Sequence, residues 1–301
     1  MKFGYFCNTT NWTHKPYHKL LDETKQITEY CDQNYWNSIW FTEHHFNHEG
    51  MESCTNPLML GADAAARTKN IRIGQAANVI TFHNPIRLAE DIATLDQLSK
   101  GRVEVGVARG VYGREAINLN KEADLKDQAK NFRLFAETLE ILKKAWSEKF
   151  FNHDGEFYTY PSPNYVWQHD MSPPSEEFMN MADSTMKKIS VLPKPYQNPH
   201  PPIHQVVDGI RSIEWAAENN INVIMWIPTV KALKIRFEAY KNKRSEVTKK
   251  NVPLGEGVTL VRDMFVADTM EEAKEKAGQH MVNYMKWVCH WRGLGLSLIH
   301  I

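Results

Sequence analysis

The segment Ile71–Gly110 constrains the fold more than any other part of this 301-residue chain. Ile71–Ile80 is an apolar run rich in strand-forming residues, and Arg102–Val107 is a second one. Between the two runs, Pro85 can open a helix, because proline lacks only an N–H that has no partner at the first helical position. Apolar residues then recur at helical spacing, and Gly101 suits the end of that helix. Two adjacent strands joined by a helix run parallel, because the connection packs on the sheet face.

The same alternation of strands and helices continues along most of the chain, and it predicts an α/β fold, namely a TIM-type (β/α)8 barrel. Hydrophobic residues make up 42% of the chain, which is enough for the core of one large domain. Further strands are predicted at Lys2–Cys7, Ser38–Thr42, Ile203–Val207, Asn222–Ile227 and Gly257–Val266, and further helices at Tyr17–Gln33, Asn56–Arg67, Asp124–Lys149, Gly209–Asn219, Lys231–Arg244 and Met270–Trp287.

Seven strand–helix units are predicted here, although a barrel of this class closes with eight, because an open sheet edge would otherwise remain. We therefore expect a single domain over residues 1–292 that lacks its eighth unit through C-terminal truncation. Residues 293–301 are too few to form both a strand and a helix, and we expect a non-native or disordered tail there. Prolines concentrated between Asn152 and Pro202 interrupt the alternation and predict an insertion over about 152–202.

Composition narrows the range of functions. The formal net charge is zero, which gives no electrostatic support for binding to nucleic acid or to an anionic membrane. No apolar run approaches the ~20 residues of a membrane span, and the run after Lys2 is too short for a signal peptide. The four cysteines form no C-x-x-C pair, so neither a disulfide framework nor a zinc site is predicted and a cytoplasmic location is expected.

The unusual residues lie where predicted strands end, which is where ligands bind in a parallel barrel. Ala76-Ala77-Asn78 places small side chains late in one strand, as if a flat group must come close. Arg109 follows the next strand, between small residues. Glu43-His44-His45 ends another strand, where alternation sends the two imidazoles to opposite sides. A histidine there could accept or donate a proton near neutral pH.

Simpler interpretations of these residues remain open. The histidines could only hydrogen-bond neighbouring loops, and Arg109 could close a loop through a salt bridge. The small residues could only allow tight packing, and Trp226 could be a core residue at the end of its strand. A metal site at Glu43-His44-His45 would need at least three converging ligands, which strand alternation disfavours, so no metal is predicted.

Several motifs together resemble the bacterial luciferase-like family of flavin-dependent monooxygenases. They are GQAANVITFHNP, LDQLSKGR and GVARGVY within Ile71–Gly110 and just beyond it, the segment Phe41–Phe46, and Glu214–Ala217. The similarity runs from Met1 to about Trp291, with gaps chiefly around residues 160–200. It implies a TIM-type barrel that binds FMN without a covalent bond, as FMNH2, and activates dioxygen.

The resemblance also implies roles for individual residues. His44 falls at the position of the catalytic histidine, and Ala76 and Ala77 fall where the family has a non-prolyl cis peptide beneath the flavin ring. Arg109 and the helix that starts near Gly209 suit a phosphate, because free N–H groups and the helix dipole favour an anion. Trp226 would form a wall of the ring pocket. The full set of expected cofactor contacts is Ala76, Ala77, Arg109, Val207, Asp208, Gly209, Ser212 and Trp226.

The sequence departs from the family pattern in two places. One hydroxyl is lost from the acidic, serine and threonine positions, which appear here as Asp208, Gly209 and Ser212, and Arg211 could replace it. Ala108 stands where luciferase has a cysteine beside the flavin. The phosphate contacts and the pocket near the ring are therefore expected to differ from those of luciferase.

The predicted function is oxygenation of a small organic substrate, such as an aldehyde or another hydrophobic compound, by FMNH2 and dioxygen. No G-x-G-x-x-G motif for NAD(P)H is visible, so a separate flavin reductase is expected as a partner. A homodimer or a heterodimer is expected as well. Three alternatives stay open: a hydride-transfer enzyme of the same superfamily that uses F420, a non-catalytic partner subunit, and a metal-dependent hydrolase barrel.

Overall fold

The computed structural model describes residues 1–226 and 229–291. Over these residues a parallel sheet curls into a nearly closed barrel with the strand order β1-β2-β3-β5-β8-β9-β10, and β4 also pairs with β5. The predicted α/β barrel of TIM type is thereby confirmed. Its strands are β1 (Gly4–Cys7), β2 (Ser38–Phe41), β3 (Arg72–Gln75), β4 (Asn78–Val79), β5 (Val103–Ala108), β8 (Ile203–Val206), β9 (Asn222–Trp226) and β10 (Val258–Val261).

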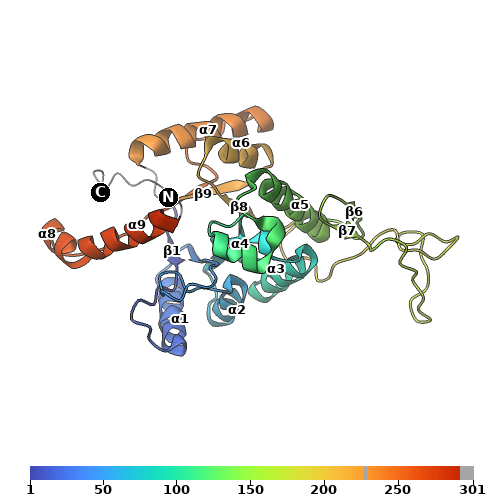
Figure 1. The fold of residues 1–301 in the computed structure, drawn as a ribbon, viewed down its shortest axis with the longest axis horizontal. Helices are drawn as coiled ribbons and strands as arrows, with labels where there is room; N and C mark the ends of the chain where they lie inside the picture. The colour runs from blue at the N-terminus through green and yellow to red at the C-terminus, as the bar shows by residue number, and fades with distance from the viewer. Residues whose placement is uncertain (227–228, 292–301) are drawn as a thin grey trace.

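Helices surround this sheet. Figure 1 shows α1, α2, α3, α5, α6 and α7 around its outside, α4 near the centre of the view, and α8 and α9 on the side away from α5. One large core of buried apolar residues joins the strands to α1, α2, α3, α5, α6 and α7. The helices are α1 (Tyr17–Gln33), α2 (Pro57–Arg67), α3 (Pro85–Ser99), α4 (Gly113–Leu119), α5 (Gln128–Ser147), α6 (Ile210–Glu218), α7 (Val230–Thr248), α8 (Met270–Ala273) and α9 (Gln279–Trp291).

Local sequence signals explain where the first barrel helices begin and end. Asn56 and Asn84 cap α2 and α3, because their side chains accept hydrogen bonds from backbone N–H groups of the first turn. A proline follows each cap, as the sequence predicted. Helix α3 ends at Lys100 and Gly101, which both have positive φ, and glycine adopts that conformation at no steric cost.

The predicted continuous strand over Ile71–Ile80 is wrong. Strand β3 ends at Gln75, the Ala76–Ala77 peptide bond is cis, and β4 resumes the path for two residues. A short 3₁₀ turn, Ile80–Phe82, follows. An apolar run alone does not reveal this break, because hydrophobicity reports burial and not backbone direction. The cis peptide itself lies where the family resemblance placed it.

Gly106 on β5 allows the neighbouring chain to bend. A Cβ atom at Gly106 would lie 1.7 Å from the carbonyl oxygen of Gln75, so only glycine fits. The Asn78 side chain donates a hydrogen bond of 3.1 Å to the Gly106 carbonyl and ties the two strands together on the other side of the bend. The path of β3 and β4 therefore depends on a missing side chain one strand away.

Some element boundaries also differ from the prediction. Strand β10 stops at Val261, whereas Gly257–Val266 was predicted, and Met264 and Val266 beyond it are exposed. The helix predicted at Met270–Trp287 continues to Trp291 and includes a π-helical turn at Lys274–Gly278. Helix α4 was not predicted, because its seven residues carry too short an apolar pattern.

The predicted insertion begins with a small hairpin of β6 (His153–Asp154) and β7 (Thr159–Tyr160). From Pro161 onwards the chain leaves the barrel as the long excursion at the right of Figure 1. Isolated bridges such as Val166–Thr185 hold it together. It returns to the barrel at β8.

Other predictions concern residues beyond these ranges. The tail at 293–301 lies outside the described residues, as does any eighth strand–helix unit after Trp291. Among the described helices, each is too short or too polar to cross a lipid bilayer.

Candidate functional site

The carboxyl ends of the barrel strands contribute side chains to one pocket. It brings together the predicted His44, the cis-linked Ala76 and Ala77, and Trp226. The other predicted cofactor contacts are not among its lining residues. They are Arg109, Val207, Asp208, Gly209 and Ser212. The lining consists of Phe6, Thr42, Glu43, His44, Glu52, Ala76, Ala77, Val79, Ala108, Gly110, Val111, Glu115, Val206, Ile224, Trp226, Val261 and Tyr284.

His44 lies between two buried carboxylates. Its Nε2 is 3.4 Å from Oε2 of Glu52, and its Nδ1 is 3.5 Å from Oε1 of Glu115. The imidazole is 14% exposed, and its backbone N–H donates to the carbonyl of Cys54. Strand β2 ends at Phe41, so the expected alternation of side chains does not extend to His44 and His45; their different partners follow from the loop instead.

A hydrogen-bond network holds Glu52 in this position. The hydroxyl of Tyr112 donates to it at 2.7 Å, and the hydroxyl of Tyr284, on α9, donates at 3.2 Å. Asn8, which follows β1, donates in turn to the Tyr284 oxygen at 3.2 Å. Burial, together with the charge of Glu52, raises the pKa of Tyr284, so the phenol remains a donor. These hydrogen bonds therefore link the residue after β1 to α9 across the mouth of the barrel.

Glu43 forms a second buried network. Its carboxylate accepts hydrogen bonds from His83 at 2.7 Å and from the backbone N–H of Val79 at 2.6 Å, and its Oε1 lies 3.0 Å from Nε2 of His45. Burial opposes ionisation, but the hydrogen bonds from His45 and His83 outweigh it and lower the pKa of Glu43. Burial likewise opposes charge on His83, yet Glu43 raises the pKa of that imidazole. The contact between Glu43 and His83 ties the loop after β2 to the residues just before α3.

The ion pair of Glu43 and His83 predicts a pH range in which both groups stabilise the folded state. Glu43 stabilises the fold above its unfolded pKa of roughly 4.3, and that contribution is lost as the pH falls through its lowered folded pKa. His83 stabilises the fold below roughly 6.5, and that contribution is lost as the pH rises through its raised folded pKa. We expect Glu43→Gln to cost about 1.5 kcal/mol between these values and less on either side, as measured by urea unfolding across pH. A cost independent of pH would contradict the pairing.

Several small residues line the pocket. Ala76, Ala77, Ala108 and Gly110 all belong to the lining. Such residues leave room for a planar ring system, because nothing larger than a methyl group projects from them. The enclosed space is about 80 Å³, below the roughly 300–1,000 Å³ of sites that bury a whole ligand. A flavin ring would extend beyond this enclosed part.

Arg109 packs beside the pocket. Its guanidinium lies 5.8 Å from the centre of the Phe132 ring, and its Nη1 is 3.5 Å from the backbone carbonyl of Gln128. Burial lowers the pKa of Arg109, although a guanidinium stays charged at any physiological pH. Phe132 in turn packs edge-on against Trp215 of α6, at 5.4 Å between ring centres. Arg109 therefore lies on the side of the barrel that carries α6.

The amino end of α6 is open. A Cβ at Gly209 would meet no atom within 4 Å, Asp208 and Arg211 are exposed, and Ser212 is half-buried. Val207 is buried and belongs to the core. The space and the free backbone N–H groups there are compatible with a phosphate.

Trp226 lines the pocket from the end of β9. Its indole N–H donates to Asp263 at 3.4 Å, and its ring lies 6.1 Å from that of Tyr284. It therefore connects the wall of the pocket to α9.

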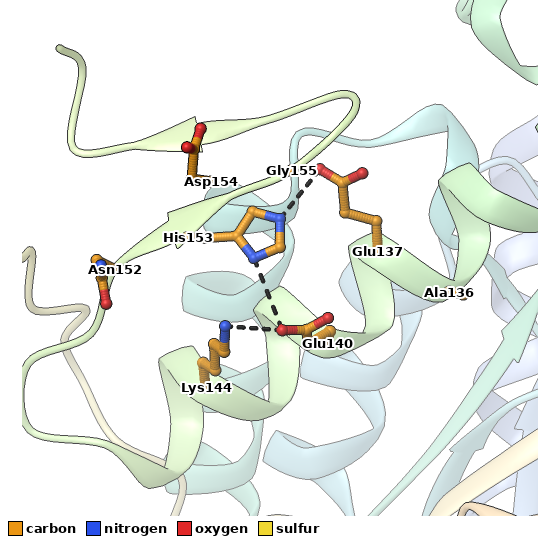
Figure 2. Close-up of a pocket in the computed structure, with 8 residues that line it drawn as sticks. All are labelled: Ala136, Glu137, Glu140, Lys144, Asn152, His153, Asp154 and Gly155. Carbon is orange, nitrogen blue, oxygen red and sulfur yellow. Dashed lines mark hydrogen bonds and ion pairs between the residues drawn. The ribbon is translucent and has the colours of Figure 1, made fainter.

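A second pocket lies on the outer surface between α5 and the β6–β7 hairpin (Figure 2). Its charged groups are paired with one another: His153 with Glu137 at 3.0 Å, and Lys144 with Glu140 at 2.7 Å. Glu137 also accepts backbone N–H groups from Glu156 to Tyr158, so it holds the hairpin turn. We attribute this cluster to local structure. Across the described parts of the chain, no group of three or more His, Cys, Asp or Glu is arranged as a metal site.

Sequence reasoning missed three residues of the pocket lining that carry charged or phenolic groups, namely Glu52, Glu115 and Tyr284, and also Tyr112, which holds Glu52. Glu115 stands three residues after the GVARGVY motif and could have been found from its position after a strand end. Tyr112 lies within that motif. Glu52 and Tyr284 meet across 232 positions of sequence, and no local pattern signals such a contact.

Comparison with known proteins shows the family to which the chain belongs. The model of the luciferase-like monooxygenases matches residues 1–295. The oxygenase component of the flavin-dependent trigonelline monooxygenase of Acinetobacter baylyi is 27% identical over 290 residues, which cover 94% of this chain and 70% of that protein. An alkanal monooxygenase alpha chain of Photorhabdus luminescens is 27% identical over 253 residues, which cover 82% of this chain and 59% of that one.

A solved structure shows the same fold. The oxygenating constituent of 3,6-diketocamphane monooxygenase from Pseudomonas putida, a type II Baeyer–Villiger monooxygenase in complex with FMN, superposes with a TM-score of 0.77 at 22% identity. The superposition covers 98% of this chain and 77% of that one. The named relatives agree with the predicted class of flavin-dependent oxidoreductase. The chain belongs to the luciferase-like monooxygenase family.

Proposed function

We propose that this chain is the oxygenase component of a flavin-dependent monooxygenase, which uses reduced FMN and dioxygen to oxygenate a small organic substrate. One observation carries the proposal: His44 and the cis-linked Ala76 and Ala77 line the same pocket. The trigonelline and alkanal monooxygenases among the relatives are named for this type of reaction. Reduced FMN supplies the electrons that activate dioxygen.

The residues at the strand ends suit a flavin. The ring would lie against Ala76, Ala77 and Ala108, with Trp226 as a side wall. The largely apolar lining would exclude water from the reacting groups. His44 would hold or deliver a proton through a ring nitrogen, since imidazole changes charge near neutral pH.

The phosphate would lie near the amino end of α6. Arg109, the backbone N–H groups that follow Asp208 and Gly209, and the Ser212 hydroxyl would hold it, while Val207 would only support the loop from the core. We expect Arg109→Ala to weaken FMN binding about tenfold, because one charge-assisted hydrogen bond is lost. Riboflavin, which lacks the phosphate, should bind both proteins equally in fluorescence titrations.

A matched control exists on α5. Arg133 is exposed and pairs with Glu156, so Arg133→Ala should leave the affinity for FMN unchanged. If Arg109→Ala weakened FMN and riboflavin equally, Arg109 would support the ring pocket and not the phosphate.

The partners follow from the relatives. The trigonelline relative is named an oxygenase component, which fits a separate reductase that delivers reduced flavin. Alpha and beta chains among the relatives fit a homodimer or heterodimer. The substrate would be small and largely apolar, because the lining offers chiefly apolar surface.

Anaerobic titration tests the cofactor. We expect FMNH2 to bind one equivalent per chain and F420 to bind far more weakly. Addition of ¹⁸O₂ to the complex, with an alkanal, trigonelline or 3,6-diketocamphane present, should then yield a product that carries one ¹⁸O atom. Preferential binding of F420, or hydride transfer to the substrate without labelled oxygen, would favour the F420 alternative instead.

A further inference from the structure

Glu52 is the least expected group in the pocket. It is a buried carboxylate, 2% exposed, on the loop between β2 and α2. Two phenols and an imidazole surround its two oxygens, so the carboxylate is fixed in direction. A buried carboxylate is costly unless it is paired, which makes a role in the site worth testing.

The contacts of Glu52 differ from those of the other buried carboxylates. Glu43 is directed at His45, His83 and the backbone N–H of Val79. Glu115 accepts the backbone N–H of His45 at 2.7 Å and approaches Nδ1 of His44. Glu52 lies near the opposite ring nitrogen, Nε2.

We infer that Glu52 is a positioning residue for His44: it fixes the orientation of the imidazole from the Nε2 side and favours its protonated form. This rests on the proposed role of His44 in proton handling. A carboxylate within about 4 Å of an imidazole favours the charged ring, particularly where water is excluded. Tyr112 and Tyr284 hold the carboxylate, so α9 and β1 contribute indirectly to the geometry of His44.

Within residues 1–226 and 229–291, three parts of the chain bring charged and titratable groups close to His44. The β2–α2 loop supplies Glu52 and, at the neighbouring positions, Glu43 and His45. The segment after β5 supplies Tyr112 and Glu115. Helix α9 supplies Tyr284, whose environment includes Asp263. The Glu52 carboxylate approaches Nε2 to 3.4 Å, so its charge should have a distinct effect.

Histidine-selective NMR of the flavin-free protein tests the inference without any turnover. The pH titration of the His44 Cε1–H resonance, assigned with His44→Gln, gives the midpoint of its protonation. We expect Glu52→Gln to lower this midpoint by about one pH unit, since the amide keeps the shape but not the charge. Glu49→Gln is the matched control: Glu49 lies on the same loop and pairs with Arg114 at 2.9 Å, and its loss should leave the midpoint in place.

A second variant keeps the inference testable if Glu52→Gln does not fold. Glu52→Asp keeps the negative charge but moves it away from His44 by one methylene. We expect it to lower the midpoint of the His44 titration by less than the one pH unit expected for Glu52→Gln. A midpoint that is unchanged in the folded variant would overturn the inference. Because the titration needs no flavin, a protein that fails to oxygenate any substrate could still show the shift, so failure of the proposed function is recognised separately.

Discussion

Replacement of His44 by alanine should reduce product formation about 10²- to 10⁴-fold, the usual range for loss of a positioned acid or base. The imidazole lies at the carboxyl end of the barrel between Glu52 and Glu115, in a pocket that excludes most solvent. The small residues Ala76 and Ala77 are unchanged in this variant, so binding of FMNH2 should persist. Product yield per FMNH2 oxidised, measured by mass spectrometry, checks this expectation.

His48→Ala is the control for that experiment. The His48 imidazole is 85% exposed. Within the described residues its one ion-pair partner is Glu49, at 3.7 Å. It should retain full product yield. Equal activity of His44→Ala and the wild-type protein would exclude a proton-handling role for His44. Loss of FMNH2 binding together with activity would instead assign His44 to the cofactor site.

Gly106→Ala should destabilise the protein by about 3 kcal/mol, because a new methyl group would overlap the backbone of Gln75. The clash distance of 1.7 Å is far inside van der Waals contact, and a backbone carbonyl cannot rotate away as a side chain can. Flavin affinity should fall as well, since β3 would be pushed from the bend that carries Ala76 and Ala77. Urea unfolding and flavin titration measure the two effects.

Gly278→Ala gives a matched comparison. A Cβ at Gly278 would meet no atom within 4 Å, and its backbone is helical, so this substitution should be neutral or slightly stabilising. If Gly106→Ala were equally neutral, the close approach of β5 to the Gln75 carbonyl would be wrong, and with it the local shape of the pocket wall.

The barrel could be predicted from sequence because its signals are local. Pro57 and Pro85 after their asparagine caps, and Gly101 after α3, each specify a helix end within a few residues. Apolar runs between such signals then gave the strands of the sheet. The resemblance to the family supplied the cis peptide at Ala76–Ala77, which periodicity alone did not indicate.

The pocket was only half predictable for a physical reason. His44, Ala76, Ala77 and Trp226 lie at strand ends, and the barrel architecture brings strand ends together. Glu52 and Tyr284 meet only because α9 packs across the mouth, and that packing depends on tertiary contacts that leave no local pattern. The strand ends at Gln75 and Val261 were missed because apolar residues resume within a few positions after both.

The phosphate contacts stay a prediction. Arg109 lies on the α6 side through Phe132 and Trp215, while Asp208, Gly209 and Ser212 lie at the start of α6. These two parts come from strands β5 and β8, which are neighbours in the sheet. Sheet order therefore explains how residues a hundred positions apart could serve one phosphate, and the comparison of FMN with riboflavin decides whether they do.

Histidine NMR during an FMN titration tests most directly whether the barrel mouth is the flavin site. His44 lies in the mouth pocket, and His153 lies in the separate surface pocket beside α5, so the two imidazoles report on different places. We predict that saturation with FMN shifts the His44 resonance and leaves that of His153 unchanged. A His44 resonance that does not move at saturating FMN would contradict the assignment of this pocket to the flavin.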